Sequence, residues 1–316
     1  MNVWGDKRYY SLDAYIKKTF GEKLYKISLD GGMTCPNRDG TIDTRGCIFC
    51  SAGGSGEFAG DRSLSIKEQL AYGKQMISRK YSGSSYIAYF QAYTNTYASV
   101  SYLEEIYMEA LRDEDVKVLS IATRPDCLSP EILDLLSRLN QIKPIWVELG
   151  LQTIHEASAK FIRRGYTLDV FEKAVYDLKM IGVCVIVHTI LYLPGETEQM
   201  MLETISYLNS LPIHGIKLQL LHILKNTDLA SYYERTPFHL PSMDEYFLLL
   251  GKLLSHLRPD IVVHRLTGDG AKNLLLAPLW TSNKRLVMNT MQKYFKDADI
   301  CQGKEFSCQN HLHSIN

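Results

Sequence analysis

Short apolar runs alternate with amphipathic stretches over most of the chain. Strands are expected at the apolar runs 24–29, 85–91, 117–122, 145–151, 183–190 and 215–221. Apolar residues at helical spacing predict helices at 11–19, 66–80, 102–112, 131–139, 169–181 and 198–210. The strands are apolar on both sides, as a parallel sheet covered by helices requires. About six such strand–helix units predict an α/β fold, a partial or complete (β/α) barrel of the triosephosphate isomerase type.

The composition of the chain shifts after residue 226. Beyond this point we expect a strongly apolar helix at 243–257, a short strand at 260–265 and a helix at 283–296. We therefore predict a barrel domain over residues 1–226, which includes an aromatic N-terminal segment. Residues 227–316 are predicted to form a C-terminal extension that packs on the barrel.

The overall charge of the chain is balanced, with 35 Lys plus Arg and 35 Asp plus Glu. A net charge of zero gives no global attraction to nucleic acid. No apolar run approaches the length of a membrane span, and no charged-then-apolar leader opens the sequence, so we expect no membrane association. The seven cysteines, odd in number and unevenly spaced, favour a reducing, cytoplasmic compartment.

Three of the cysteines, Cys35, Cys47 and Cys50, follow the first predicted strand closely. Proline and glycine residues between them let the loop fold back and bring three thiolates together. A 4Fe–4S cluster held by three cysteines leaves one iron free, whereas structural zinc normally takes four ligands. The triplet therefore favours an iron–sulfur centre. A redox dithiol and a zinc site completed by a distant histidine remain as alternatives.

The triplet, which ends in Cys-Ile-Phe-Cys at 47–50, resembles the cluster motif of radical S-adenosylmethionine (SAM) enzymes in a long-spaced variant. Cys-Pro-Asn-Arg-Asp-Gly-Thr (35–41), Tyr-Phe-Gln-Ala-Tyr-Thr-Asn-Thr-Tyr (89–97) and Thr-Arg-Pro-Asp-Cys-Leu (123–128) resemble the YhcC/YtqA family. That family is similar to the radical half of the elongator catalytic subunit. The resemblance implies a 4Fe–4S cluster, SAM as cofactor and an external one-electron reductant such as flavodoxin or ferredoxin. It also implies reductive cleavage of SAM to a 5′-deoxyadenosyl radical.

Polar side chains follow the second predicted strand at Gln91, Tyr93, Thr94 and Asn95. In a barrel of this type the chemistry lies where strands end and loops begin. The amide and hydroxyl groups suit the amino group of an amino-acid-like ligand. The resemblance implies that this loop binds the methionine part of SAM, and an aromatic-rich packing loop is the alternative.

Glu148 and Gln152 lie four residues apart on the fourth predicted strand, so both point to one face. A glutamate that faces into a barrel needs a partner, because an unpaired buried carboxylate is costly. The resemblance implies contacts to the ribose and the amino group of SAM. A polar barrel layer that is satisfied internally is the alternative.

Three arginines, Arg124, Arg163 and Arg164, come after strand ends and are candidates for the carboxylate of SAM. The resemblance favours Arg164, because it precedes a glycine. The alternatives are an ion pair with Asp126 for Arg124 and a solvated surface charge for Arg164.

The fifth strand carries His188, which points inward if the run is a strand, and ends before Leu193, Pro194 and Gly195. The resemblance implies that the stretch after this strand cradles the adenine of SAM. A lone histidine in an apolar strand is also typical of a satisfied core residue.

The substrate is the most open question at this stage. The resemblance favours the carbon-5 side chain of the wobble uridine of tRNA, with phosphates meeting a basic face. That face would consist of Lys272, Lys284, Arg285, Lys293 and Lys296. A solvated helix face is the alternative. Radical modification of a small metabolite or peptide is a second possible function, and a non-enzymatic iron–sulfur or zinc scaffold or redox sensor is a third.

Overall fold

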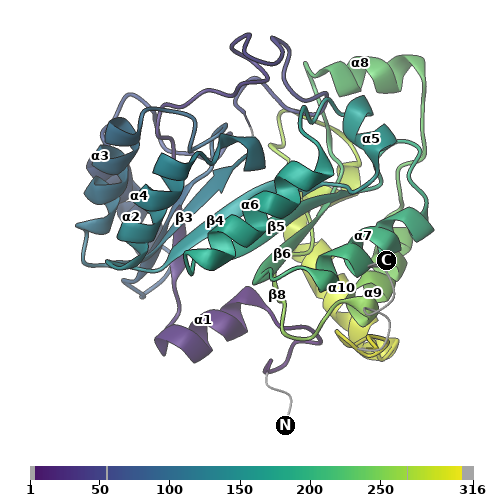
Figure 1. The fold of residues 1–316 in the computed structure, drawn as a ribbon. Coiled ribbons are helices and arrows are strands. Elements are labelled where there is room, and N and C mark those ends of the chain that lie inside the picture. Colours follow the sequence, from purple (N-terminus) through teal and green to yellow (C-terminus); the bar gives the residue numbers. More distant parts are fainter. Residues whose placement is uncertain (1–3, 55, 269, 308–316) are drawn as a thin grey trace.

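The structure, a computed structural model, describes residues 4–54, 56–268 and 270–307. In this part of the chain the main sheet has seven parallel strands in the order β1-β2-β3-β4-β5-β6-β8. The sheet curls into a partial barrel, which confirms the predicted fold class (Figure 1). Its strands are β1 (Tyr25–Leu29), β2 (Tyr86–Phe90), β3 (Val116–Thr123), β4 (Ile145–Gln152), β5 (Cys184–Leu191), β6 (Gly215–Leu220) and β8 (Val262–Arg265).

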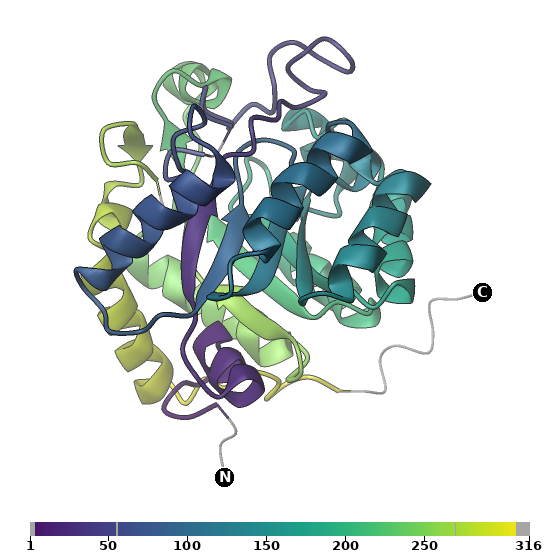
Figure 2. The ribbon, with the colours of Figure 1, turned by 90° about the vertical axis from the view of Figure 1, so that its left-hand side faces the viewer.

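Helices between the strands cover the outer face of the sheet (Figures 1 and 2). They are α2 (Ile66–Ser78), α3 (Val100–Leu111), α4 (Pro130–Asn140), α5 (Glu156–Phe161), α6 (Leu168–Met180) and α7 (Glu198–Ser210). Three of them begin at side-chain caps: Ser65 and Glu68 form a capping box at α2, Ser99 caps α3 and Thr197 caps α7. The single-turn 3-10 helix η1 (Pro125–Cys127) follows β3.

The strand predicted at 260–265 continues the barrel sheet, because β8 pairs in parallel with β6. The division of the chain at residue 226 stays a prediction. The remaining elements are α1 (Leu12–Phe20), α8 (Asp228–Arg235), α9 (Met243–His256), η2 (Leu279–Ser282), α10 (Lys284–Asp297) and the antiparallel pair β7 (Ile223–Leu224) and β9 (Leu275–Ala277).

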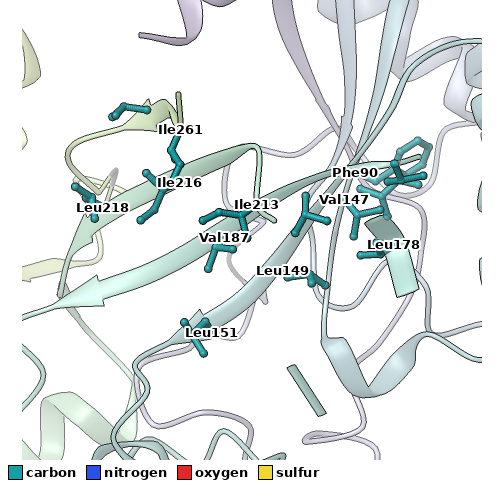
Figure 3. Close-up of a cluster of buried hydrophobic side chains, with 14 of the residues drawn as sticks. Phe90, Val147, Leu149, Leu151, Leu178, Val187, Ile213, Ile216, Leu218 and Ile261 are labelled. Carbon is teal, nitrogen blue, oxygen red and sulfur yellow. The ribbon is translucent and has the colours of Figure 1, made fainter. Parts of the chain in front are cut away.

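The main core lies between the outer face of the sheet and the helices (Figure 3). Outward-facing strand residues such as Val147, Leu149 and Val187 are fully buried there, and Leu178 of α6 packs against them. Burying an aliphatic side chain of this kind contributes about 1.5–3 kcal/mol. This core fixes the strand register, and the register decides which side chains face into the barrel.

Inside the barrel, apolar and polar side chains occupy different layers along the strands. At the end where the strands begin, an apolar plug closes the barrel, made of Ile16, Leu24, Ile87, Val118, Trp146 and Ile186. Ile16 comes from α1, which lies across this end (Figure 1). Two residues further along β3, β4 and β5, the inward positions change to Ser120, Glu148 and His188. The polar interior therefore begins one layer above the plug.

No helix in the described ranges is long and apolar enough to cross a lipid bilayer.

Candidate active site

A cavity of about 530 Å³ opens at the carboxyl ends of the strands. All seven strands of the main sheet contribute to its wall, through residues that include Lys26, Tyr89, Thr123, Glu148, His188, Lys217 and Arg265. This volume is within the range of about 300–1,000 Å³ of small-molecule sites. The cavity is therefore large enough for a cofactor and part of a substrate.

The three cysteines of the predicted cluster motif, Cys35, Cys47 and Cys50, all line this cavity. Within the described residues, no three or more His, Cys, Asp or Glu side chains converge to hold one metal ion. Three thiols on one cavity wall are the donor set of a 4Fe–4S cluster that keeps one iron open. Burial raises the pKa of Cys47 to about 12, so ligation by this thiol must displace a proton.

The cysteine loop is held on the barrel by polar contacts from its own residues. Asn37 donates its amide to the carbonyl of Arg163 at 2.8 Å, and the same nitrogen lies 3.5 Å from Cys47 Sγ. The Arg38 guanidinium donates to the carbonyls of Cys50 and Ser51 at 3.0 and 2.6 Å. The backbone therefore presents all three thiols to one space.

The loop after β2 packs on the glycine-rich stretch that follows Cys50. The backbone N–H of Tyr93 donates to the carbonyl of Gly54 at 2.9 Å, and the Tyr93 hydroxyl donates to Ala52. A Cβ added to Gly54 would lie 2.3 Å from the Tyr93 ring, so a glycine is required there. Tyr93 itself has a φ of 58°. Left-handed backbone at a non-glycine residue is uncommon and concentrates at functional sites.

The floor of the cavity is a buried ionic network centred on Glu148. Its Oε1 accepts from Lys26 Nζ at 3.1 Å and from Ser120 Oγ at 2.9 Å. Its Oε2 lies 2.7 Å from His188 Nε2 and also accepts from Lys217 Nζ. The partners come from β1, β3, β5 and β6, so one carboxylate links strands on both sides of the barrel.

The charge states of this network follow from burial and from the neighbouring charges. Burial acts to raise the pKa of Glu148, but Lys217 and Lys26 outweigh it and hold the pKa well below the usual range. Burial lowers the pKa of His188 to about 4, and Lys217 adds to this effect. Burial also lowers the pKa of Lys217 to about 7. At neutral pH the floor thus holds a carboxylate, a neutral imidazole and an amine that can titrate.

Comparison with protein families decides the assignment of this barrel. The model of the radical SAM superfamily matches residues 44–208, and that of the radical SAM C-terminal domain matches residues 213–297. The chain belongs to the radical SAM superfamily. It is therefore an enzyme rather than a non-enzymatic scaffold, and membership of this superfamily implies a 4Fe–4S cluster and SAM.

Individual proteins similar to this chain narrow its assignment within the superfamily. Uncharacterized protein YtqA of Bacillus subtilis is 42% identical over 301 residues, which cover 95% of this chain and 94% of that protein, and this confirms the YhcC/YtqA resemblance. The tRNA uridine(34) acetyltransferase of Methanocaldococcus jannaschii is 24% identical over 180 residues, which cover 56% of this chain and 33% of that protein. The structure of Elp3 from the archaeon Methanocaldococcus infernus has a TM-score of 0.66 at 16% identity, over 88% of this chain and 64% of that one. The likeness to Elp3 shows a shared fold.

The residues predicted to hold the methionine part of SAM mostly lie on the wall of the radical SAM barrel. Gln91, Tyr93 and Thr94 line the cavity, while Asn95 is fully buried and does not. The amide nitrogen of Gln91 is buried and has no hydrogen-bond partner within the described residues. Because an unpaired buried donor is costly, Gln91 fits a ligand acceptor in the cavity.

On the fourth strand the two predicted residues differ in their surroundings. Glu148 has a fully buried side chain, and both of its carboxylate oxygens are hydrogen-bonded within the protein. This arrangement corresponds to the alternative prediction of an internally satisfied polar layer. Gln152 lines the cavity at a φ of 64°, and its Oε1 accepts from the Tyr166 hydroxyl at 3.2 Å. The contacts of both residues with SAM stay predictions.

The three candidate arginines are used in different ways. Arg124 forms a two-pronged ion pair with Asp126, at 2.9 and 2.7 Å, as its alternative predicted. Arg163 pairs with Asp228 and does not line the cavity. Arg164 is buried, which contradicts a surface charge, and donates to the carbonyls of Leu151, Thr153 and Tyr166. Arg124 and Arg164 reach the cavity wall, so a role at the SAM carboxylate stays open to these two.

The residues predicted to cradle adenine lie elsewhere. Leu193, Pro194 and Gly195 line a second cavity of about 270 Å³, together with Tyr192 and Phe238. None of the three lines the larger cavity. Ile190 and His188 are the residues of β5 that do. Adenine contacts from 193–195 therefore stay a prediction, and Ile190 is an apolar residue of the cavity that the cysteines line.

Sequence reasoning missed the cationic part of the floor. Lys26 and Lys217 are the partners of Glu148, and neither was singled out. A signal was present: each is the one charged residue of its strand, at an inward position of the two-residue period. Such a charge indicates a buried polar partner, because an unpaired one would be too costly.

Proposed function

We propose that this radical SAM enzyme modifies the carbon-5 side chain of the wobble uridine of tRNA. The observation that carries its chemistry is that Cys35, Cys47 and Cys50 all line one 530 Å³ cavity in a chain that belongs to the superfamily. The similarity to a tRNA uridine(34) acetyltransferase supports the tRNA substrate.

In this proposal the three cysteines hold the 4Fe–4S cluster at the mouth of the cavity. When bound, the cluster supplies one electron for cleavage of the SAM sulfonium. The chain contributes the surroundings: Arg38 fixes the backbone of Cys50, and Asn37 ties the loop to residue 163. An external flavodoxin or ferredoxin would deliver the electron.

SAM would lie along the wall between the cysteines and the floor. Gln91, whose amide nitrogen has no partner within the described residues, would donate to the methionine part, and Gln152, which lines the same cavity, would meet the ribose or the amino group. Arg124 or Arg164 faces the carboxylate. The target base would be splayed from the anticodon loop, as single-stranded RNA bases are when enzymes act on them.

The test is mass spectrometry of tRNA nucleosides from cells with and without the gene. We expect the modified wobble uridine to disappear with the gene and its precursor to accumulate. Complementation with Cys47→Ala should fail to restore it and Cys301→Ala should restore it, because Cys301 lies outside the cavity. Anaerobic iron content of the same two variants gives a second readout.

An unchanged nucleoside profile would overturn tRNA as the substrate. A purified protein that binds SAM and iron but leaves tRNA unchanged would redirect the proposal to a small metabolite or a peptide.

A further inference from the structure

Lys217 is an unusual residue for the floor of a cavity. It lies on β6 with its side chain 3% exposed, yet it lines the cavity. Its Nζ pairs with Glu148 and lies 3.4 Å from the Tyr89 hydroxyl and 4.8 Å from the centre of the Tyr89 ring. None of the proposed SAM contacts uses this amine.

We propose that Lys217 is a catalytic proton-transfer residue, whose Nζ on the cavity floor gives a proton to a heteroatom of the bound substrate. In this step an N–H bond of the ammonium breaks and an X–H bond forms on a substrate oxygen or nitrogen. The electron pair stays on Nζ, and the positive charge passes to the substrate atom, which uses a lone pair to bind the proton. Hydronium from bulk solvent at the cavity mouth then returns a proton to the amine. The step needs no oxidant or reductant. It rests on one part of the proposed function, which is that the substrate enters this cavity.

Lys217 and Lys26 share a single carboxylate, that of Glu148. Glu148 Oε2 serves both Lys217 and His188, while Oε1 serves Lys26 and Ser120. One negative charge is thus divided between two lysines, and a buried ammonium with a shared counter-ion releases its proton more readily than a fully paired one.

Three neighbours of Lys217 on the floor, Glu148, His188 and Tyr89, each hold one charge state at neutral pH. Glu148 stays ionised, His188 stays neutral with a pKa of about 4, and burial raises the pKa of Tyr89 well above its usual value. Burial lowers the pKa of Lys217 to about 7, Glu148 opposes this, and Lys26 and Arg265 add to it. A group that titrates near the working pH is the most effective proton donor. The groups that face Lys217 are Lys26, Tyr89, Glu148, His188, His264 and Arg265.

A permanent ion pair would explain the same contacts without any proton transfer. The two roles differ in whether the amine titrates in the folded protein. Competitive acetylation of the intact protein with acetic anhydride over a range of pH, read out by peptide mass spectrometry, measures this for each lysine. We expect a midpoint near pH 7 for Lys217, and a lower one in Glu148→Gln because the carboxylate raises this pKa. A midpoint above about pH 9 in the wild type would overturn the proposal.

The kinetic test is Lys217→Arg, which keeps the charge and the partner of Glu148 but cannot release a proton at neutral pH. General acid catalysis contributes about 10²–10⁴-fold, so we expect kcat to fall at least about 100-fold with a small change in KM. The limb of the pH–rate profile near pH 7 should vanish. Lys143→Arg is the matched control, because Lys143 is a partly buried lysine that bonds to the Asp113 carbonyl outside the cavity.

A Lys217→Arg enzyme that retains kcat within about threefold and keeps that limb would overturn the catalytic role. If the wild type does not turn over tRNA at all, the proposed substrate fails. In that case the acetylation midpoint still decides whether Lys217 exchanges a proton on the cavity floor.

Discussion

At the scale of single residues, His188 gives the protein a predictable sensitivity to acid. Its pKa is about 4 in the folded protein, against about 6.5 in an unfolded chain, because burial disfavours the imidazolium. Between these values the unfolded chain binds the proton and the folded one does not, so the free energy of unfolding falls as the pH falls. From pH 7 to pH 5 this residue alone should cost about 2 kcal/mol.

His188→Gln should remove this part of the acid sensitivity, because glutamine can still donate to Glu148 but does not titrate. Urea unfolding of the wild type and the variant at pH 7 and pH 5 measures the difference. Equal losses of stability in the two proteins would contradict a buried neutral His188.

The two-residue period of a strand was enough to predict that Glu148 and Gln152 face the same interior. The partners of Glu148 were beyond such reasoning. Lys26 and Lys217 are 122 and 69 residues away along the chain, and only the register of β1, β4 and β6 brings them to one carboxylate. Arg164 illustrates the same limit, since a guanidinium bonded to backbone carbonyls leaves no trace in the spacing of residues.

At the scale of elements, the contact between the loop after Cys50 and the loop after β2 is testable through Gly54. This glycine has a φ of 60°, and an added Cβ would lie 2.3 Å from the Tyr93 ring. Gly54→Ala should therefore combine backbone strain with overpacking, at a total of about 2–4 kcal/mol. We also expect weaker SAM binding in calorimetry, because Tyr93 lines the cavity.

Gly21→Ala is the matched control for this prediction. Gly21 has a φ of 74° but no atom within 4 Å of an added Cβ, so its cost should be limited to backbone strain, about 1 kcal/mol. Equal thermal unfolding midpoints for the two variants would show that the contact with Tyr93 contributes nothing.

The long elements were predictable because each pairs an apolar run with a clear period, and α7 has the predicted bounds 198–210. The short elements α5, α8, β7 and β9 were not predicted. Segments of two to eight residues have too little periodicity to identify, and they are stabilised by tertiary contacts. The hydrogen bond from Leu229 at the start of α8 to the Ile48 carbonyl, at 2.9 Å, is one such contact.

At the scale of the whole molecule, α10 carries four of the five residues of the predicted basic face, in two halves at its two ends, and Lys272 precedes it. Figure 2 shows α10 running along the side of the molecule, from the level of β9 toward the end closed by α1. Its 14 residues span about 20 Å. Lys284 and Arg285 lie at the end near β9, and Lys293 and Lys296 lie toward the other end. The two halves are therefore at different distances from the cavity mouth.

If tRNA enters at the mouth, reversing Lys284 and Arg285 to Glu should weaken its binding. The slope of log affinity against log salt should change by roughly one unit for each phosphate that the variant no longer neutralises. Reversing Lys293 and Lys296 changes the same charge on the same helix and should have a smaller effect. Filter binding at several salt concentrations measures both, and equal effects would mean that α10 does not orient the RNA toward the cavity.

Gln302 joins two parts of the chain that lie 292 residues apart in the sequence. Its side chain accepts from the backbone N–H of Tyr10 and donates to the carbonyls of Arg258 and Ile261, each at 2.8 Å. The backbone of Val263 also donates to Tyr10, at 2.7 Å. The segment around Tyr10 is synthesised before β8 and before Gln302, which are its partners. During translation its backbone groups therefore stay without these partners until residue 302 has been made.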